Sequence, residues 1–264
     1  MPAEWTGSES PRPTTPGEGF CLPGAVRAIK QPAMDASAQA SGAAANADQK
    51  ALARQGATVR ARLARDPSVQ RLAGDAGEMA ELFGVAGFLG LDECARLCAM
   101  VDAVARPSHT FDYGEASPYR TSFSSDVDRT DPFVRMIERR IDDLLGLDPA
   151  LGETVQGQRY TQGQQFNAHF DWFATSAAYW PEQRARGGQR SWTAMVYLNT
   201  VAAGGATEFP ELCLAIPPQE GTLLAWNNAT REGLPNRAML HAAAPVVQGR
   251  KYVITKWYRT RAWG

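Results

Sequence analysis

The stretch Gln164-Gln165-Phe166-Asn167-Ala168-His169-Phe170-Asp171-Trp172 is the most informative part of this chain of 264 residues. We interpret it as a β-strand that carries a histidine and an aspartate two positions apart. Because successive side chains of a strand point to opposite faces, His169 and Asp171 should point in the same direction. A second histidine, His241, opens another predicted strand much further along the chain.

Two histidines and one carboxylate on a β scaffold are the ligand set of non-haem Fe(II) oxygenases. His169 and Asp171 would supply two ligands from one strand, and His241 would complete a facial triad from a facing strand. Three coordination positions would then stay open for small ligands. His-x-Asp alone is a weak signal, because such pairs are common on protein surfaces. The second histidine and a nearby lysine make the metal interpretation the favoured one.

The lysine is Lys251, which follows His241 and the predicted turn Gln248-Gly249-Arg250. If the chain reverses at this turn, Lys251 can face the interior, where a buried ammonium needs an anionic partner. Arg250, pointing to the opposite face, and Lys256, as a further exposed lysine, are the alternative cations. The residue pattern leaves open which of them is buried.

The part of the chain after Glu153 is predicted to be rich in β-strands. Short alternating segments are separated by Gly and Pro, which is typical of a sandwich or barrel. The predicted strands are 155–160, 166–172, 192–201, 207–209, 212–216, 222–226, 241–246 and 252–258. The fold class predicted from the residues is therefore α+β with a mainly β core.

The part of the chain before Glu153 is predicted to be mostly helical. Residues 1–45 are rich in Pro, Ala, Ser and Gly and are expected to form a disordered tail. Residues 46–75 form a helical lead-in, and residues 76–264 form the main domain, which opens with a strand over 78–89. Helices are predicted over 91–104 and 131–145, with few elements between them. Asp131 and Pro132 provide the cap and first turn of the second helix.

The composition argues against some classes of partner. The formal net charge is −1, so no basic field attracts nucleic acid or an anionic membrane. We expect neither a membrane span nor a secretory signal. Cys94 and Cys98 lie four residues apart on a predicted helix, where we interpret them as small packing residues rather than metal ligands. These features favour a reducing, cytoplasmic location.

Four segments together resemble the prolyl 4-hydroxylases, which are Fe(II)/2-oxoglutarate dioxygenases with a double-stranded β-helix (jelly-roll) core. The resemblance runs from about Glu78 to Tyr258. Arg120-Thr121-Ser122 resembles a further family segment. The four segments with the strongest resemblance are Arg159–Asp171, Gly187-Gly188-Gln189-Arg190 leading into Val196–Asn199, Gly204–Pro210 and His241–Trp257.

The resemblance implies a role for individual residues. His169, Asp171 and His241 would bind iron. Lys251 would pair with the carboxylate of 2-oxoglutarate that lies far from the metal. The remaining residues implied by the resemblance are Tyr160, Thr207 and Trp257 around the co-substrate, and Arg190 and Arg120 toward the substrate opening.

The implied reaction uses Fe(II), 2-oxoglutarate and O₂, with ascorbate expected as reductant. It hydroxylates an unactivated C–H bond, and the favoured substrate is a prolyl residue in a peptide or protein. A free amino acid or small natural product is the alternative, and a non-catalytic ligand-binding β-helix domain is a third. The sequence departs from the family at Ala206, where an acidic residue is usual, and such loop changes bear on the substrate. Regiochemistry and oligomeric state are left open.

Overall fold

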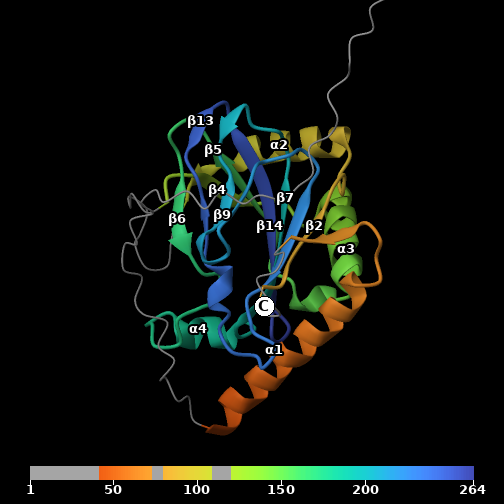
Figure 1. The fold of residues 1–264 in the computed structure, drawn as a ribbon, viewed down its shortest axis with the longest axis vertical. Helices are drawn as coiled ribbons and strands as arrows, with labels where there is room; N and C mark the ends of the chain where they lie inside the picture. Colours follow the sequence, from red (N-terminus) through yellow and green to blue (C-terminus); the bar gives the residue numbers. More distant parts are fainter. Residues whose placement is uncertain (1–41, 73–79, 109–119) are drawn as a thin grey trace, which may run out of the picture.

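A computed structural model describes residues 42–72, 80–108 and 120–264. Its largest sheet has eight strands, each antiparallel to its neighbours (Figure 1). In spatial order the strands are β1 (Val69–Arg71), β2 (Leu82–Val85), β11 (Leu223–Asn227), β7 (Arg190–Tyr197), β14 (Lys251–Arg259), β5 (Gln156–Tyr160), β4 (Phe123–Asp126) and β3 (Arg106–Pro107). Residues 1–41 of the tail predicted over 1–45 lie outside the described residues, and residues 42–45 are not a disordered tail but the first turn of a helix that starts at Gly42.

A second, four-stranded sheet packs against one face of the large sheet. Its strands are, in order, β10 (Leu214–Ile216), β9 (Thr207–Phe209), β12 (His241–Ala243) and β6 (Phe166–His169). A two-stranded ribbon joins β13 (Val246–Gln248) to β8 (Ala203–Gly204). The two facing antiparallel sheets form the predicted jelly roll, so the mainly β fold class is confirmed.

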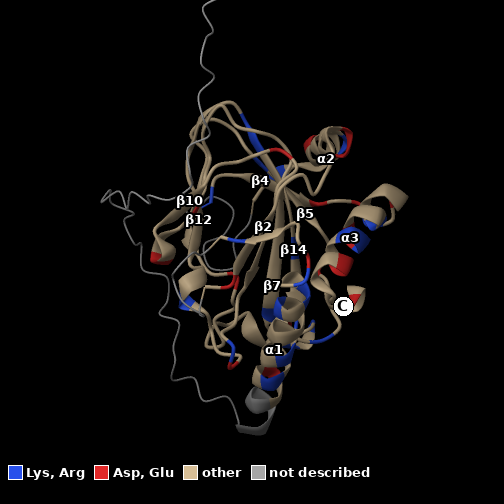
Figure 2. Cartoon of the chain, turned by 45° about the vertical axis from the view of Figure 1, so that its right-hand side comes forward, with Lys and Arg blue, Asp and Glu red and all other residues tan. Residues whose placement is uncertain are grey.

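Three long helices cover the other face of the large sheet (Figure 1). The long helices are α1 (Gly42–Leu63), α2 (Leu91–Val104) and α3 (Pro132–Leu145). The short ones are α4 (Trp180–Ala185) and the 3-10 turns η1 (Pro149–Leu151), η2 (Pro210–Leu212) and η3 (Arg237–Met239). In Figure 2, residues of both charges lie along α1 and α3.

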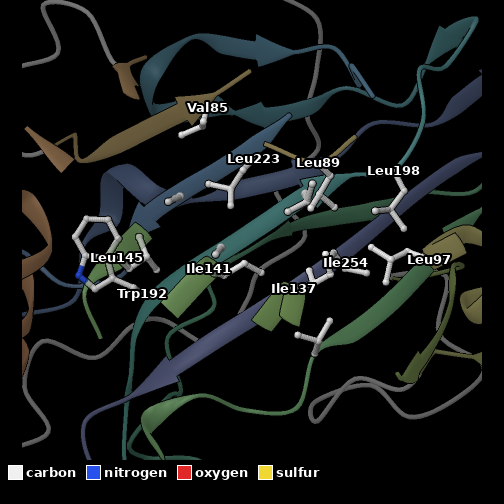
Figure 3. Packing of buried hydrophobic residues seen from close by; sticks show 14 of the residues in the cluster. Val85, Leu89, Leu97, Ile137, Ile141, Leu145, Trp192, Leu198, Leu223 and Ile254 are labelled. Atoms are coloured by element: carbon white, nitrogen blue, oxygen red, sulfur yellow. The ribbon is translucent and has the colours of Figure 1, made fainter. Parts of the chain in front are cut away.

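The two faces of the large sheet bury different residues because side chains alternate along each strand. On β7, Trp192, Ala194 and Val196 face the helices, where they join a core with Ile137 and Ile141 of α3 (Figure 3). Met195 and Tyr197 of the same strand belong to a second core, between the two sheets. The close-packed apolar core between the large sheet and the helices makes this sheet a rigid wall of the space between the two sheets.

Helix α3 forms where the local signals predict it. The side chain of Asp131 accepts a hydrogen bond of 2.7 Å from the backbone N–H of Phe133, and Pro132 occupies the first turn. Gly146 ends the helix with φ 67°, a left-handed conformation that glycine adopts without steric cost. The predicted helix over 131–145 and its cap are therefore confirmed.

Helix α2 has the predicted bounds, and only a narrow face of it is buried. Cys94, Leu97 and Val101 are buried, whereas Leu91 and Val104 are 70% and 44% exposed. Burial raises the pKa of the Cys94 thiol to about 11, and a buried neutral thiol is a packing residue. The interpretation of Cys94 as a small core residue agrees with this environment.

Several boundaries differ from the predictions. Helix α1 begins at Gly42 and ends at Leu63, and β1 follows Pro67 inside the predicted helical lead-in of 46–75. Proline cannot donate the helical hydrogen bond and disfavours helix in the residue before it, so the helix stops early. The predicted strand over 241–246 is divided into β12 and β13 by Pro245. The segment 105–130 contains the short strands β3 and β4, and the strand expected over 78–89 is confined to β2.

Within the described residues, the structure contains no helix with the length and apolar character that crossing a membrane requires.

Candidate metal centre

His169, Asp171 and His241 come together at one end of the inter-sheet space. Each offers a ligand atom, and these atoms all lie within 4.8 Å of one another. His169 of β6 and His241 of β12 are direct partners across an antiparallel pair, with ring centroids 4.2 Å apart. The predicted triad is therefore assembled by the pairing of two short strands.

The sequence suggested that Asp171 lies on the same strand as His169. In the structure it lies outside that strand. Strand β6 ends at His169, and Asp171 lies two residues further on, in a bend. The chain turns here toward the large sheet, and the Asp171 carboxylate lies 3.7 Å from the Nε2 atom of His241. The prediction of two ligands on one strand was wrong, but the bend delivers the carboxylate to the same place.

Backbone carbonyl groups orient both imidazole rings. The Nδ1 atom of His169 lies 2.8 Å from the carbonyl oxygen of Asn167, and that of His241 lies 2.9 Å from the carbonyl oxygen of Met239. A carbonyl oxygen can only accept, so Nδ1 carries the proton in each ring and Nε2 keeps its lone pair. Both histidines thus present the nitrogen that a metal ion needs.

The electrostatics favour the metal-binding protonation states. Burial and repulsion by His241 lower the pKa of His169 to about 3, so its ring is neutral at physiological pH. Burial alone would raise the pKa of Asp171, but His241, Arg190 and a hydrogen bond from Thr193 outweigh it and lower that pKa. Two imidazole nitrogens and one carboxylate are a donor set that suits Fe(II).

Aromatic rings line the wall of this centre. The ring of Phe166 stacks on that of His169 with centroids 3.6 Å apart, and Trp226 meets His241 edge-on at 4.9 Å. Trp226 is buried on β11 and belongs to the core between the sheets. These rings restrict the histidines to their observed orientations and keep water away from one side of the centre.

Lys251 is buried at the start of β14 and faces the same cavity. Its ammonium donates a hydrogen bond of 3.3 Å to the hydroxyl of Thr207 and lies over the rings of Tyr160 and Tyr197, at 5.5 and 5.4 Å. Among the residues that the structure describes, no carboxylate lies within ion-pair distance of it. Burial lowers the pKa of Lys251 to about 7. A buried cation in this setting requires an anionic ligand.

The alternative cations are distinguished by the structure. Arg250 is exposed, as the sequence analysis allowed. Lys256 is not the exposed residue that we had expected, because its ammonium is buried 2.7 Å from the Asp142 carboxylate of α3. Odd-numbered residues of β14 line the cavity and Lys256 points to the opposite face. Lys251 is thus the cavity lysine of this strand.

Tyr160, Thr207 and Trp257 also line the cavity, as predicted. Tyr160 lies directly beside Lys251 across the β5–β14 pair, and its hydroxyl donates to the Gln158 side chain at 2.9 Å. The hydroxyl of Thr207 receives a hydrogen bond of 2.6 Å from Tyr197.

Arg190 and Arg120 lie in the cavity, but their surroundings differ. Arg190 forms a bidentate ion pair with Glu153, in which its Nε and Nη2 atoms donate to the two carboxylate oxygens at 2.7 and 2.8 Å. Its guanidinium carbon lies 4.0 Å from the centroid of the Trp257 ring. Arg120 donates to Ser122 at 3.0 Å and lies over the Phe166 ring at 4.7 Å. Sequence reasoning missed Glu153, since no local motif marks an acid whose partner lies across the sheet.

The cavity has a volume of about 540 Å³ and opens to the surface. Its floor holds the three metal-ligand candidates and Lys251, and its outer part extends over β4 and β5 to the segment after Asp171. A volume of this size lies within the range of small-molecule sites. It accommodates a small co-substrate and leaves space in front of the metal centre.

Comparisons with known proteins agree with this geometry. The model of the 2OG-Fe(II) oxygenase superfamily matches residues 155–259. The chain is 39% identical over 131 residues to prolyl 4-hydroxylase subunit alpha-1 of Rattus norvegicus, a match that covers 50% of this chain and 24% of that protein. It is 32% identical over 197 residues to probable prolyl 4-hydroxylase 4 of Arabidopsis thaliana, which covers 65% of this chain and 64% of that protein.

Among solved structures, the viral collagen prolyl hydroxylase of Paramecium Bursaria Chlorella virus-1, in its 2OG complex, superposes with a TM-score of 0.53. It is 25% identical, and the match covers 67% of this chain and 94% of that chain. The family model covers less than half of this chain, so the similarity to the 2OG-Fe(II) oxygenase superfamily applies to residues 155–259. The two curated relatives described above are named prolyl 4-hydroxylases, one of them as probable, and the chain spans less than two thirds of the length of each.

Lys251 predicts a pH dependence of 2-oxoglutarate binding. Its pKa is about 7 in the ligand-free protein, and only the ammonium form pairs with a carboxylate. Because ligand carboxylates stay ionised above about pH 5, the dissociation constant should be flat below about pH 7 and rise about tenfold per pH unit above it, until the pKa of the occupied site is reached. Calorimetry on Mn(II)-loaded protein should therefore detect proton uptake on binding above neutral pH. Binding without proton uptake at about pH 8 would contradict this role.

Proposed function

We propose that this protein hydroxylates a prolyl residue in a peptide or protein, as an Fe(II)- and 2-oxoglutarate-dependent dioxygenase. The observation that carries the proposal is the presence of a complete two-histidine, one-carboxylate cluster and a buried lysine in one open cavity. Similarity to proteins named prolyl 4-hydroxylases supports the substrate class.

Different residues of the cavity would bind the metal ion and the co-substrate. His169, Asp171 and His241 would hold Fe(II), with both rings pre-oriented by carbonyl groups. When bound, Fe(II) supplies the oxidising chemistry with O₂, and 2-oxoglutarate is converted to succinate and CO₂ while one oxygen atom enters a C–H bond. Lys251 would pair with the carboxylate of 2-oxoglutarate that is remote from the metal, since it is the buried cation at a hydroxyl-lined end of the cavity.

The outer part of the cavity would receive the peptide. Arg190 and Trp257 form a flat stacked surface beside the metal centre, and Glu153 holds the arginine in place. Arg120 presents a buried guanidinium to the same cavity. Guanidinium groups donate to carbonyl oxygens and aromatic rings pack on proline, so these groups suit a proline-containing peptide backbone.

The proposal is tested by product formation against two substrate panels. Purified protein with Fe(II), 2-oxoglutarate and ascorbate would be offered proline-containing peptides and, separately, free amino acids. The expected result is peptide-stimulated succinate together with a peptide heavier by one oxygen atom. Oxygen addition to a free amino acid alone would move the enzyme to the small-molecule class. Stoichiometric binding of metal and 2-oxoglutarate without any turnover would instead favour a ligand-binding domain.

A further inference from the structure

Two buried side chains stand behind the Asp171 carboxylate. The hydroxyl of Thr193, on β7, donates a hydrogen bond of 2.7 Å to Asp171 Oδ2. The Nδ2 atom of Asn228 donates a hydrogen bond of 2.9 Å to the same hydroxyl oxygen. All three residues are buried. Hydrogen bonds of this kind, in which every member is satisfied, hold their groups in one arrangement.

The chemistry of these groups allows only one direction of donation. Asp171 is ionised and can only accept, so the single hydroxyl proton of Thr193 must point to it. The hydroxyl oxygen must then accept from its other neighbour, which requires the NH₂ group of Asn228 rather than its carbonyl oxygen. Asn228 therefore sets the direction in which the Thr193 hydroxyl points.

Asn228 is itself fixed by backbone contacts. Its N–H donates to the carbonyl oxygen of Ser191 at 2.8 Å, and its carbonyl oxygen accepts from the N–H of Asn236 at 3.0 Å. Asn236 caps the short turn η3, and His241 follows that turn directly. The side chain of Asn228 thus contacts Thr193, which bonds Asp171. The backbone of Asn228 contacts the loop that leads to His241.

The preceding residue connects this arrangement to the N-terminal helix. Asn227 Nδ2 donates to Glu81 Oε2 at 2.7 Å, and Glu81 forms an ion pair with Arg60 of α1. Helix α1 also packs closely at Gly56, where an added Cβ atom would lie 2.9 Å from Asn227 Nδ2. Of these two consecutive asparagines at the end of β11, Asn227 faces helix α1 and Asn228 faces the metal centre.

The geometry points to Asn228 as a positioning residue for the metal centre, acting through Thr193 on Asp171. This inference rests on the proposed function, because it takes His169, Asp171 and His241 to be metal ligands. By holding the Thr193 proton on the carboxylate, Asn228 restricts Asp171 to the orientation that faces the two histidines. Supporting groups of this type typically contribute about 10- to 100-fold in metal affinity or activity.

The test measures the affinity of the protein for Mn(II), a redox-stable substitute for Fe(II), by electron paramagnetic resonance titration. Thr193→Val removes the hydroxyl without changing the shape of the side chain much, and Asn228→Leu removes the amide. Each should raise the dissociation constant for Mn(II) at least about tenfold. Thr193→Ser restores the donor and should bind Mn(II) nearly as well as the wild type.

Ser191→Ala provides a matched control. Ser191 is a buried hydroxyl residue of the same strand, and its hydroxyl donates to the carbonyl oxygen of Tyr258, away from Asp171. It should leave the Mn(II) affinity unchanged. If Thr193→Val and Asn228→Leu bind Mn(II) like the wild type, or if Ser191→Ala weakens binding as much as they do, the positioning role is overturned. If the wild type binds no Mn(II), the proposed function fails and this inference fails with it.

Discussion

Replacing Lys251 by alanine should raise the KM for 2-oxoglutarate at least about 30-fold, because truncating one partner of a buried charge pair costs about 2 kcal/mol or more. Lys251 is buried, and its ammonium contacts Thr207 and two tyrosine rings rather than a carboxylate of the described chain. Initial rates at varied 2-oxoglutarate, with peptide saturating, measure the effect. The KM for the peptide should change much less, since the lysine lies at the co-substrate end.

Arg250→Ala is the matched control for this experiment. Arg250 is the adjacent cation in the chain and is exposed, so its removal changes the net charge equally. It should leave the KM for 2-oxoglutarate within about fivefold, since exposed ion pairs contribute at most about 1 kcal/mol. Lys251→Met, which keeps the apolar stem, reveals whether any loss reflects folding. A KM that stays at the wild-type value in Lys251→Ala would mean that another group binds the co-substrate.

Replacing His169 by alanine should reduce product formation more than about a thousandfold, because a metal ion contributes several kcal/mol to the transition state. The ring of His169 is held by Phe166 and by the Asn167 carbonyl group, and alanine leaves no donor atom at the Nε2 position. The reaction is followed as peptide-dependent succinate release.

The thermal shift caused by metal separates this loss from a loss of folding. A ligand that binds only the folded state raises the melting temperature. Mn(II) should stabilise the wild type and should not measurably stabilise His169→Ala, while both metal-free proteins should unfold cooperatively. Retained turnover together with a retained metal-induced shift would show that His169 is not a ligand.

Local signals predicted those parts of the fold that depend on neighbouring residues. The cap at Asp131 and the glycine after α3 act within one turn, so they can be recognised in the sequence. The residue pattern pointed to a buried lysine near Gly249 but left Lys251, Arg250 and Lys256 open, and the structure shows that Lys251 is the one in the cavity. The three candidate ligands were likewise identified from the pattern, and the structure brings them together.

Features that depend on pairing between distant segments were missed. Lys256 was predicted to be exposed, but its partner Asp142 lies on α3, 114 residues away in the chain. Glu153 pairs with Arg190 across the large sheet, and no sequence motif near either residue predicts this ion pair. Burial of such charges is decided by the register of strands and the docking of helices, which no local pattern contains.

Short polar strands were missed for a related reason. Strand β4 has the sequence Phe-Ser-Ser-Asp and contributes little apolar area, so its pattern resembles a turn. It becomes a strand because β5 offers it a complete hydrogen-bonding edge. The position of Asp171 beyond the end of β6 also involves a distant segment, since its carboxylate accepts a hydrogen bond from Thr193 of the large sheet.

The most direct test of the proposed activity is the mass spectrum of a proline-containing peptide after incubation under isotopically labelled dioxygen. The reaction would contain the protein, Fe(II), 2-oxoglutarate and ascorbate, with His169→Ala and Lys251→Ala in parallel. We expect one labelled oxygen atom on a proline residue with the wild type, almost none with His169→Ala, and a much lower yield with Lys251→Ala when 2-oxoglutarate is near the wild-type KM. Succinate formed at full rate with every peptide and amino acid unmodified would contradict prolyl hydroxylation, and labelled product from His169→Ala at the wild-type rate would contradict the assigned site.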